Sequence, residues 1–202
     1  MKRTTLFAGL LMISATAFAQ NIKLPAPQKN GGKPLMEALS ERKSARTFDA
    51  KALSEQTLSN LLWAAYGFNR DGMRTVPSAN NKQEFEVYAV TEKGAYLYNA
   101  KENTLEQVSS EDLRAKTGGQ AFVGTAPLNL VFAYDTKKMS DEKIAYADCG
   151  FIAQNVYLYC TSEGLATVVR AGGMNREDLA KAISLKPGYA IVFSQTVGYP
   201  KK

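Results

Sequence analysis

Strand patterns and helix patterns are interleaved along this chain, but they do not follow the strict strand–helix–strand repeat of a doubly wound fold. Apolar alternation and continuous apolar runs predict five strand segments. The second segment is expected to form a hairpin of two strands that turns around Asn99 to Asn103. These strands span residues 84–90, 95–108, 128–134, 165–169 and 189–198. The order of elements therefore favours an α+β fold, a sheet flanked by helices.

The longest helix is expected from about Asp141 to Glu163, because apolar residues recur there at helical spacing and Gly164 follows. Shorter helices are expected at four other places. One starts at Pro34, one follows a Ser54 cap and ends at Gly67, one opens at Ser109 or Ser110, and one follows an Asn175 cap. A polar loop is expected over residues 69–82.

The first nineteen residues have the features of a secretory signal peptide. Lys2 and Arg3 precede a short apolar run, and Ala17-Phe18-Ala19 is a small-x-small cleavage site. We expect residues 1–19 to be removed, 20–33 to form a flexible arm, and 34–202 to form one domain. No other stretch has the ~18 to 20 apolar residues of a membrane helix. The expected location is outside the cytoplasm: periplasmic in a Gram-negative source, otherwise secreted.

Charge and residue usage narrow the possible functions. Without Lys2 and Arg3, the 25 basic residues become 23 against 19 acidic ones, and the two signs are interspersed, which argues against a nucleic-acid partner. The sequence has no His, which excludes a Ser-His-Asp triad and His-ligated zinc, and no metal site is predicted. Cys149 and Cys160 fall on the long predicted helix about 16 Å apart, too far for a disulfide.

A cluster of cations, Arg42, Lys43 and Arg46, surrounds Ser44 at the end of the first predicted helix. Two interpretations are open. The cations can form a solvated helix end, since basic residues are favoured near a helix C-terminus. Alternatively, guanidinium and hydroxyl donors in one short span suit a phosphate monoester.

Two further segments combine small residues with polar groups. In "PSANN", residues 77–81, small side chains allow a flat ligand near the backbone, although an ordinary polar turn is the favoured interpretation of this segment alone. In "GLATVVRAGGM", residues 164–174, Gly172 and Gly173 permit close backbone approach, or form a plain strand–helix loop. Neither a Walker pattern nor a strand-anchored GxGxxG is present.

Five segments in a fixed order give a more specific indication. They are "RKSARTF", "LLWAAYGFNRDGMRTVPSANN", "GAYLY", "DCGFIAQNVYLYCTSEGLATV" and "VGYP". In this order the chain resembles the nitroreductase family of flavoproteins over about residues 35–200. The "LLWAAYG…R…PSA" and "GAYLYN…L" segments are most similar to the branch that oxidises thiazoline and oxazoline rings in peptides.

The resemblance implies a central, mostly antiparallel sheet and a homodimer with FMN in clefts at the subunit interface. It assigns the FMN phosphate and ribityl chain to Arg42, Ser44 and Arg46, with Lys43 acting mainly through its backbone. The partner subunit's copy of 77–81 would lie beside the flavin ring, as would the chain's own 171–173. The remaining cofactor-binding candidates implied by the resemblance are Pro77, Ser78, Ala79, Asn81, Gln120, Ala171, Gly172, Gly173, Lys201 and Lys202.

The implied function is an exported FMN-dependent oxidoreductase that moves hydride or electrons between an unknown donor and a small organic acceptor. The flavin carries the chemistry, so no protein nucleophile is needed and no catalytic side chain is assigned. An exported protein has little access to NADH or NADPH, the usual reductants of the family. The alternative is a non-catalytic protein that holds a flavin or another flat ligand on the same fold.

Two departures from the family pattern affect these expectations. Relatives often continue past "GYP" with a basic segment that closes on the phosphate, whereas this chain stops at Lys201 and Lys202. Either these lysines take its place or the phosphate pocket is more open. The ring-oxidising branch also uses a Lys-Tyr pair, and the counterpart here, residues 137–139, has no Tyr, which argues against azoline oxidation.

Overall fold

Seven strands pair in one sheet in the order β1-β6-β5-β4-β7-β9-β8, and every neighbouring pair is antiparallel. The computed structural model describes residues 21–201, so the predicted signal peptide and Lys202 lie outside the described part. The strands are β1 Ile22–Lys23, β4 Phe85–Thr91, β5 Gly94–Asn99, β6 Thr104–Ser109, β7 Leu128–Asp135, β8 Ala166–Arg170 and β9 Tyr189–Gly198. The predicted α+β class is confirmed.

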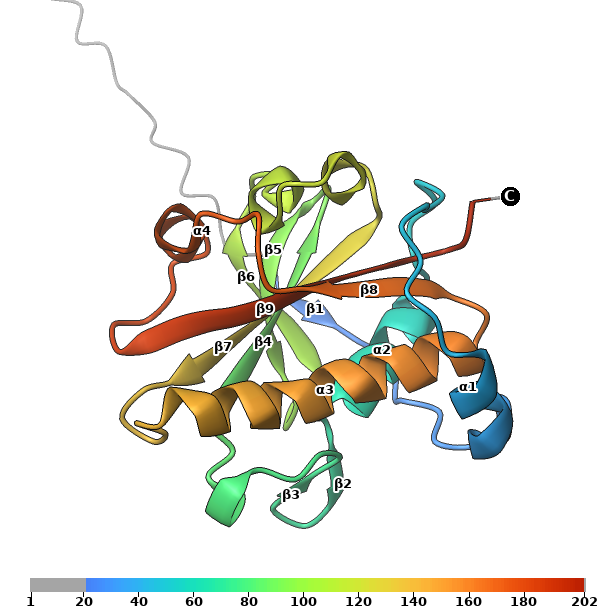
Figure 1. Cartoon of the computed structure of the whole chain (residues 1–202), viewed down its shortest axis with the longest axis horizontal. Helices are drawn as coiled ribbons and strands as arrows, with labels where there is room; N and C mark the ends of the chain where they lie inside the picture. Colours follow the sequence, from blue (N-terminus) through green and yellow to red (C-terminus); the bar gives the residue numbers. More distant parts are fainter. Residues whose placement is uncertain (1–20, 202) are drawn as a thin grey trace, which may run out of the picture.

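Two helices cover one face of the sheet. α2, Glu55–Tyr66, begins where the Ser54 side chain accepts a hydrogen bond from the Thr57 N–H, and α3, Glu142–Ser162, begins at an Asp141 cap. Figure 1 shows α3 running diagonally across the sheet with α2 behind it. Leu61, Ile152 and Val156 are fully buried between these helices and the strands, where each large side chain contributes about 1.5–3 kcal/mol.

The opposite face carries smaller elements. These are α4, Arg176–Ala182, and two single-turn 3-10 helices, η2 at Arg114–Thr117 and η3 at Ala121–Gly124. Leu179 and Leu113 are fully buried there against Tyr88 and Val131. Because both faces are covered, the central strand β7 is a continuous buried run rather than an alternating one.

Three short elements lie outside these layers. α1, Leu35–Glu41, starts directly after Pro34, as predicted. In place of a plain polar loop, residues 68–81 form a two-stranded hairpin, β2 Phe68–Arg70 with β3 Met73–Arg74, followed by η1 Ala79–Asn81. In Figure 1 the hairpin projects from the body on the side of α3 away from β8.

The expected flexible arm over 20–33 differs from the structure, which attaches residues 21–33 to the domain. Ile22 pairs with Leu105 at the sheet edge, and Leu24 is buried in the core. The Pro25 carbonyl accepts hydrogen bonds from the Ser59 hydroxyl at 2.6 Å and the Asn103 amide at 2.8 Å. The prolines and glycines suggested mobility, but this segment covers the otherwise open edge of β6.

A second difference concerns the helix expected at Ser109 or Ser110. β6 continues to Ser109, and helical turns appear only at 114–117. Asp112 sets the position of this turn, because its carboxylate accepts hydrogen bonds from the Arg114 backbone and side chain. Across residues 21–201, no helix combines the length and the apolar character needed to span a bilayer.

Candidate functional site

The segment that follows α1 lies against β8 and the C-terminal half of α3. The Ala45 N–H donates to the Thr167 carbonyl at 2.9 Å, which fixes the loop beside the strand. Ser44 Oγ lies 2.8 Å from the hydroxyl of Tyr157 on α3, and that hydroxyl also accepts from the Val169 N–H at 3.1 Å. Ser44 is thereby held in a fixed position at the base of the loop.

The cations of this loop remain available to a ligand. Arg42 is half-buried with its guanidinium 5.2 Å from the centre of the Tyr157 ring, while Lys43 and Arg46 are exposed. None of the three forms an ion pair with a residue in 21–201. Three uncompensated positive charges around a positioned hydroxyl make an anion-binding corner.

The predicted glycine segment continues directly from β8. Ala171, Gly172 and Gly173 are exposed, and a side chain added at Gly172 would meet no atom within 4 Å. Thr167, whose carbonyl accepts from Ala45 in the loop of the cations, lies four residues before Ala171. Each residue of a strand adds ~3.3 Å. The anion-binding corner and the exposed backbone therefore lie along one strand, about 13 Å apart.

A second glycine pair, Gly118 and Gly119, packs on the first one. A Cβ atom built at Gly173 would lie 2.8 Å from the Gly119 nitrogen, and one built at Gly119 would lie 3.0 Å from the Gly173 carbonyl oxygen. Only residues without side chains allow this backbone contact. Gln120, which follows, is exposed at the same place. We call these two pairs, 118–119 and 172–173, the glycine wall.

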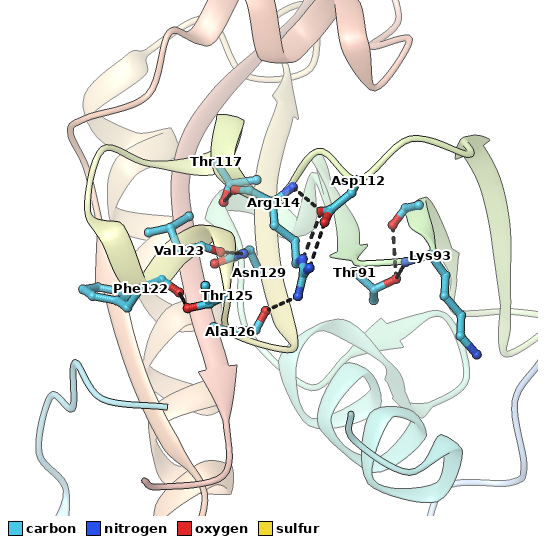
Figure 2. Close-up of polar contacts among 11 residues, drawn as sticks. Thr91, Lys93, Asp112, Arg114, Thr117, Phe122, Val123, Thr125, Ala126 and Asn129 are labelled. Carbon is cyan, nitrogen blue, oxygen red and sulfur yellow. Dashed lines mark hydrogen bonds and ion pairs between the residues drawn. The ribbon is translucent and has the colours of Figure 1, made fainter. Parts of the chain in front are cut away.

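The turn that carries Gly118 and Gly119 is held rigidly against β7. Figure 2 shows Arg114 forming a bidentate pair with Asp112 and donating to the Ala126 carbonyl at 3.1 Å. It also shows the buried Asn129 donating to the Val123 carbonyl at 2.9 Å. These contacts fix η2 and η3 on either side of the glycine pair.

Sequence reasoning missed the glycine pair 118–119 and also Arg170, whose guanidinium lies against Gly118. The signal for the pair was present, because "TGGQ" at 117–120 repeats the two consecutive glycines of "AGGM" at 171–174. Arg170, by contrast, comes directly after the strand predicted over 165–169 and is the last residue of the observed β8, and nothing in the sequence indicates that its side chain is buried.

The "PSANN" segment lies elsewhere in the single chain. The Ala79 N–H donates to Asp148 Oδ2 on α3 at 2.9 Å, and the Ser78 hydroxyl accepts from the Gln83 N–H at 2.9 Å. Pro77, Ser78 and Asn81 line a hollow of about 370 Å³ that the β2–β3 hairpin also borders. In Figure 1 this region lies below α3, and the glycine segment after β8 lies above it.

Arg74 fixes the hairpin next to this segment. Its guanidinium lies 4.2 Å from the centre of the Tyr66 ring and 4.0 Å from that of Phe68, and it donates to the Tyr66 carbonyl at 2.9 Å. Burial lowers the pKa of Arg74 and raises that of Tyr66 to about 12. Tyr66 therefore stays protonated at neutral pH.

One chain thus assembles only part of the predicted set. Arg42, Lys43, Ser44 and Arg46 lie beside β8, and Gln120 and 171–173 lie at its end, whereas 77–81 are on the other side of α3. Lys201 is exposed after the bridge between Phe48 and Pro200, and Lys202 is outside the described residues. A larger hollow of about 680 Å³, between residues 28–33, α2 and α3, contains none of the predicted residues.

Comparison with known proteins gives a consistent result. A family model described as "Nitroreductase family" matches residues 39–199. A protein of Methanocaldococcus jannaschii named as a nitroreductase is 30% identical over 169 residues, 75% of this chain and 85% of that protein.

Solved structures agree. A crystal structure of a nitroreductase from Ralstonia eutropha JMP134 superposes with a TM-score of 0.85 at 41% identity, covering 96% of this chain and 97% of that one. One from Desulfovibrio desulfuricans, solved in complex with FMN, has a TM-score of 0.64 at 19% identity, covering 84% and 88% of the two chains. At that identity the second structure shows a shared fold.

Proposed function

This chain belongs to the nitroreductase family and is an oxidoreductase; from that premise we propose that it is an exported, FMN-dependent enzyme acting on a small organic acceptor. One observation carries the cofactor assignment. An anion-binding corner with no ion-pair partner among residues 21–201 lies beside β8, and the exposed glycines 172 and 173 follow the end of that strand. A flat heterocycle with a phosphate-bearing chain needs both features, because its phosphate requires an anion-binding site and its ring requires open backbone to lie against.

The residues present fit FMN in kind and in arrangement. Arg42, Ser44 and Arg46 would hold the phosphate and the ribityl chain, and Tyr157 keeps the Ser44 hydroxyl in place. The open space over Gly172 leaves room for a ring to approach the backbone, where N–H groups can donate to its edge. Gln120 adds an exposed amide beside the same wall.

Bound FMN would supply the redox chemistry by accepting a hydride and passing two electrons on. The protein's part is binding and electrostatics. Arg46 or Lys43 would place a positive charge where the reduced cofactor gains negative charge, which favours reduction. Small side chains along 171–173 would let a donor and then an acceptor use one cleft in turn.

We propose that the functional unit is a homodimer. Apolar side chains on α1 and on the adjacent α3 are exposed: Met36 is 75% and Leu35 61% accessible, and Phe151 and Ile144 are exposed on α3. Exposed apolar groups gathered on neighbouring helices mark an interface. A partner docked there would bring its own residues 77–81 towards the glycine wall, which explains why one chain separates them.

The branch and the location are proposals as well. The segments around residues 61–79 and 94–99 support a place near the azoline-oxidising branch. Lys137 and Lys138 precede a buried Met139 where that branch has a Tyr, so we propose a different small acceptor. A signal peptide over 1–19 would place the enzyme outside the cytoplasm, with a donor other than NADH or NADPH.

Spectroscopy of the purified protein tests the cofactor assignment. We expect a yellow protein with the flavin absorption bands, or an apoprotein that acquires them when FMN is added. A protein that stays colourless with excess FMN would contradict the proposal. Stopped-flow mixing of the photoreduced, FMN-loaded protein with a quinone or a nitroaromatic compound then separates the two functions. Rapid reoxidation supports an enzyme, and inertness towards both supports a flavin-binding protein.

Replacing Arg42 or Arg46 with Ala tests the phosphate site. Each lost charge-assisted hydrogen bond contributes about 1.5–3 kcal/mol, so we expect FMN to dissociate roughly ten- to a hundredfold more readily from each variant. Fluorescence titration of released flavin measures this. Lys181→Ala, which removes an exposed charge on α4, is the control. If all three variants retain FMN equally well, the phosphate binds at a different site.

A further inference from the structure

Arg170, the last residue of β8, is a buried cation without a counter-ion. Its residue is 7% exposed, and no carboxylate among residues 21–201 pairs with it. Its Nε atom has no hydrogen-bond partner in the described structure. Buried charges are normally paired, because desolvation makes them costly. An unpaired one next to a candidate site calls for a functional explanation.

We propose that Arg170 is a positioning residue whose uncompensated charge, fixed beneath the glycine wall, favours the reduced form of the bound flavin. This inference rests on the proposed function, since it concerns how the same site treats its cofactor.

The guanidinium lies directly under the glycine pair 118–119. A Cβ atom built on Gly118 would be 1.8 Å from Arg170 Nη1, so a side chain at this position would displace the guanidinium. Nη1 donates to the Thr117 carbonyl at 3.1 Å, and its Cζ atom is 5.9 Å from the centre of the Phe122 ring. The side chain therefore ties the turn at 117–122 to the strand that leads into 171–173.

All of its hydrogen-bond acceptors are neutral. Nη2 donates to Asn129 Oδ1 at 3.1 Å and to Thr196 Oγ1 at 2.8 Å, and both of these residues are fully buried. Burial lowers the pKa of Arg170 to about 10, so the group remains charged at neutral pH. Because water is excluded, its field is screened less than that of a surface cation.

Reduction adds negative charge to the flavin, and the positive charge of Arg170 can stabilise it. A hydride adds two electrons and one proton to the neutral oxidised flavin ring, and the reduced ring that results carries one negative charge in addition to the charge of the phosphate. A fixed positive charge nearby binds that anion more tightly than the oxidised ring, which raises the two-electron potential. Exposed Lys43 and Arg46 act in the same direction but are screened by solvent.

The midpoint potential of FMN in the intact protein, measured by equilibration with reference dyes, tests this inference. Arg170→Met removes the charge, and Asn129→Asp keeps the acceptor while placing a carboxylate against the guanidinium. We expect each to lower the affinity for reduced relative to oxidised FMN about tenfold or more, a drop of at least about 30 mV.

Two controls separate charge from structure. Thr196→Val removes one hydrogen bond of Arg170 but leaves its charge, and Lys116→Met removes an exposed charge from η2. Both should keep the wild-type potential. If Arg170→Met does not fold, Asn129→Asp decides alone. FMN bound at an unchanged potential in the charge variants would overturn this inference and leave the cofactor assignment intact, whereas wild-type protein that binds no FMN would end both.

Discussion

At the scale of single residues, the most unusual group besides Arg170 is Glu84, which precedes β4. Its residue is 1% exposed, and neither carboxylate oxygen has a hydrogen-bond partner in the described structure. Burial raises the pKa of Glu84. The carboxylate of Asp148 on α3 raises this pKa further, and the positive charge of Lys82 partly offsets this effect. The carboxyl is therefore best accommodated when protonated.

This predicts a dependence of stability on pH. A folded pKa above the unfolded value of about 4.3 means that the native state holds its proton more tightly than the unfolded chain. Stability from this group is complete below about pH 4 and is lost as the pH rises to the folded pKa. The loss is about 1.4 kcal/mol for each unit by which the pKa is raised.

Urea unfolding between pH 4 and pH 8 checks this prediction with Glu84→Gln, which mimics the protonated acid. We expect the variant to become progressively more stable than wild type as the pH rises. Glu92→Gln, at an exposed position in the β4–β5 turn, should follow the wild-type curve. Parallel curves for Glu84→Gln and wild type would mean that Glu84 ionises normally in the fold.

At the scale of elements, the glycine wall shows how two turns become one surface. Gly173 has a φ of +81°, a conformation that costs a residue with a side chain about 1–2 kcal/mol, and its neighbour Gly119 leaves no room for a Cβ. Gly172 meets neither restriction. The two adjacent glycines should therefore respond differently to the same substitution.

We expect Gly173→Ala to lose at least about 1–2 kcal/mol of stability, since the strained backbone and the contact with Gly119 act together. Gly172→Ala should unfold like wild type but bind FMN more weakly, because its new methyl group occupies the approach to the wall. Thermal unfolding and flavin titration of both proteins measure these effects. Equal stability of the pair would contradict the packing, and unchanged FMN affinity in Gly172→Ala would remove that residue from the cofactor site.

At the scale of the whole molecule, helices and turns cover the centre of both faces of the sheet, yet apolar side chains remain exposed on α1 and α3. Leu39 and Phe151 are 44% and 46% exposed on these helices. Leaving such side chains in water is unfavourable by about 25 cal/mol for each Å². In the homodimer that we propose, a second copy covers this surface and supplies its residues 77–81 to the site.

Replacing Phe151 with Glu tests the dimer. A charge in the centre of an apolar interface is costly to bury, so we expect a monomer with largely reduced FMN retention. Light scattering after size exclusion gives the mass, and absorption gives the flavin content. Lys181→Glu is the surface control. A variant that stays dimeric, or a wild-type protein that is monomeric at micromolar concentration, would place the interface elsewhere or exclude it.

The sequence by itself determined the fold class and the positions of most elements. Apolar periodicity and capping residues act over a few positions, so Ser54, Asp141 and Asn175 mark helix starts that the structure reproduces. The cation cluster and the glycine segment after β8 were also visible as short patterns. Family resemblance supplied the expectation that joins them into one site.

Only the tertiary structure decided which distant groups meet. The attachment of residues 21–33 depends on an open edge of β6, and the wall depends on contact between 118–119 and 172–173, over fifty residues apart. The burial of Glu84 and Arg170 likewise follows from the helices and turns packed over them. Desolvation and steric contact depend on neighbours in space, and a linear pattern does not contain them.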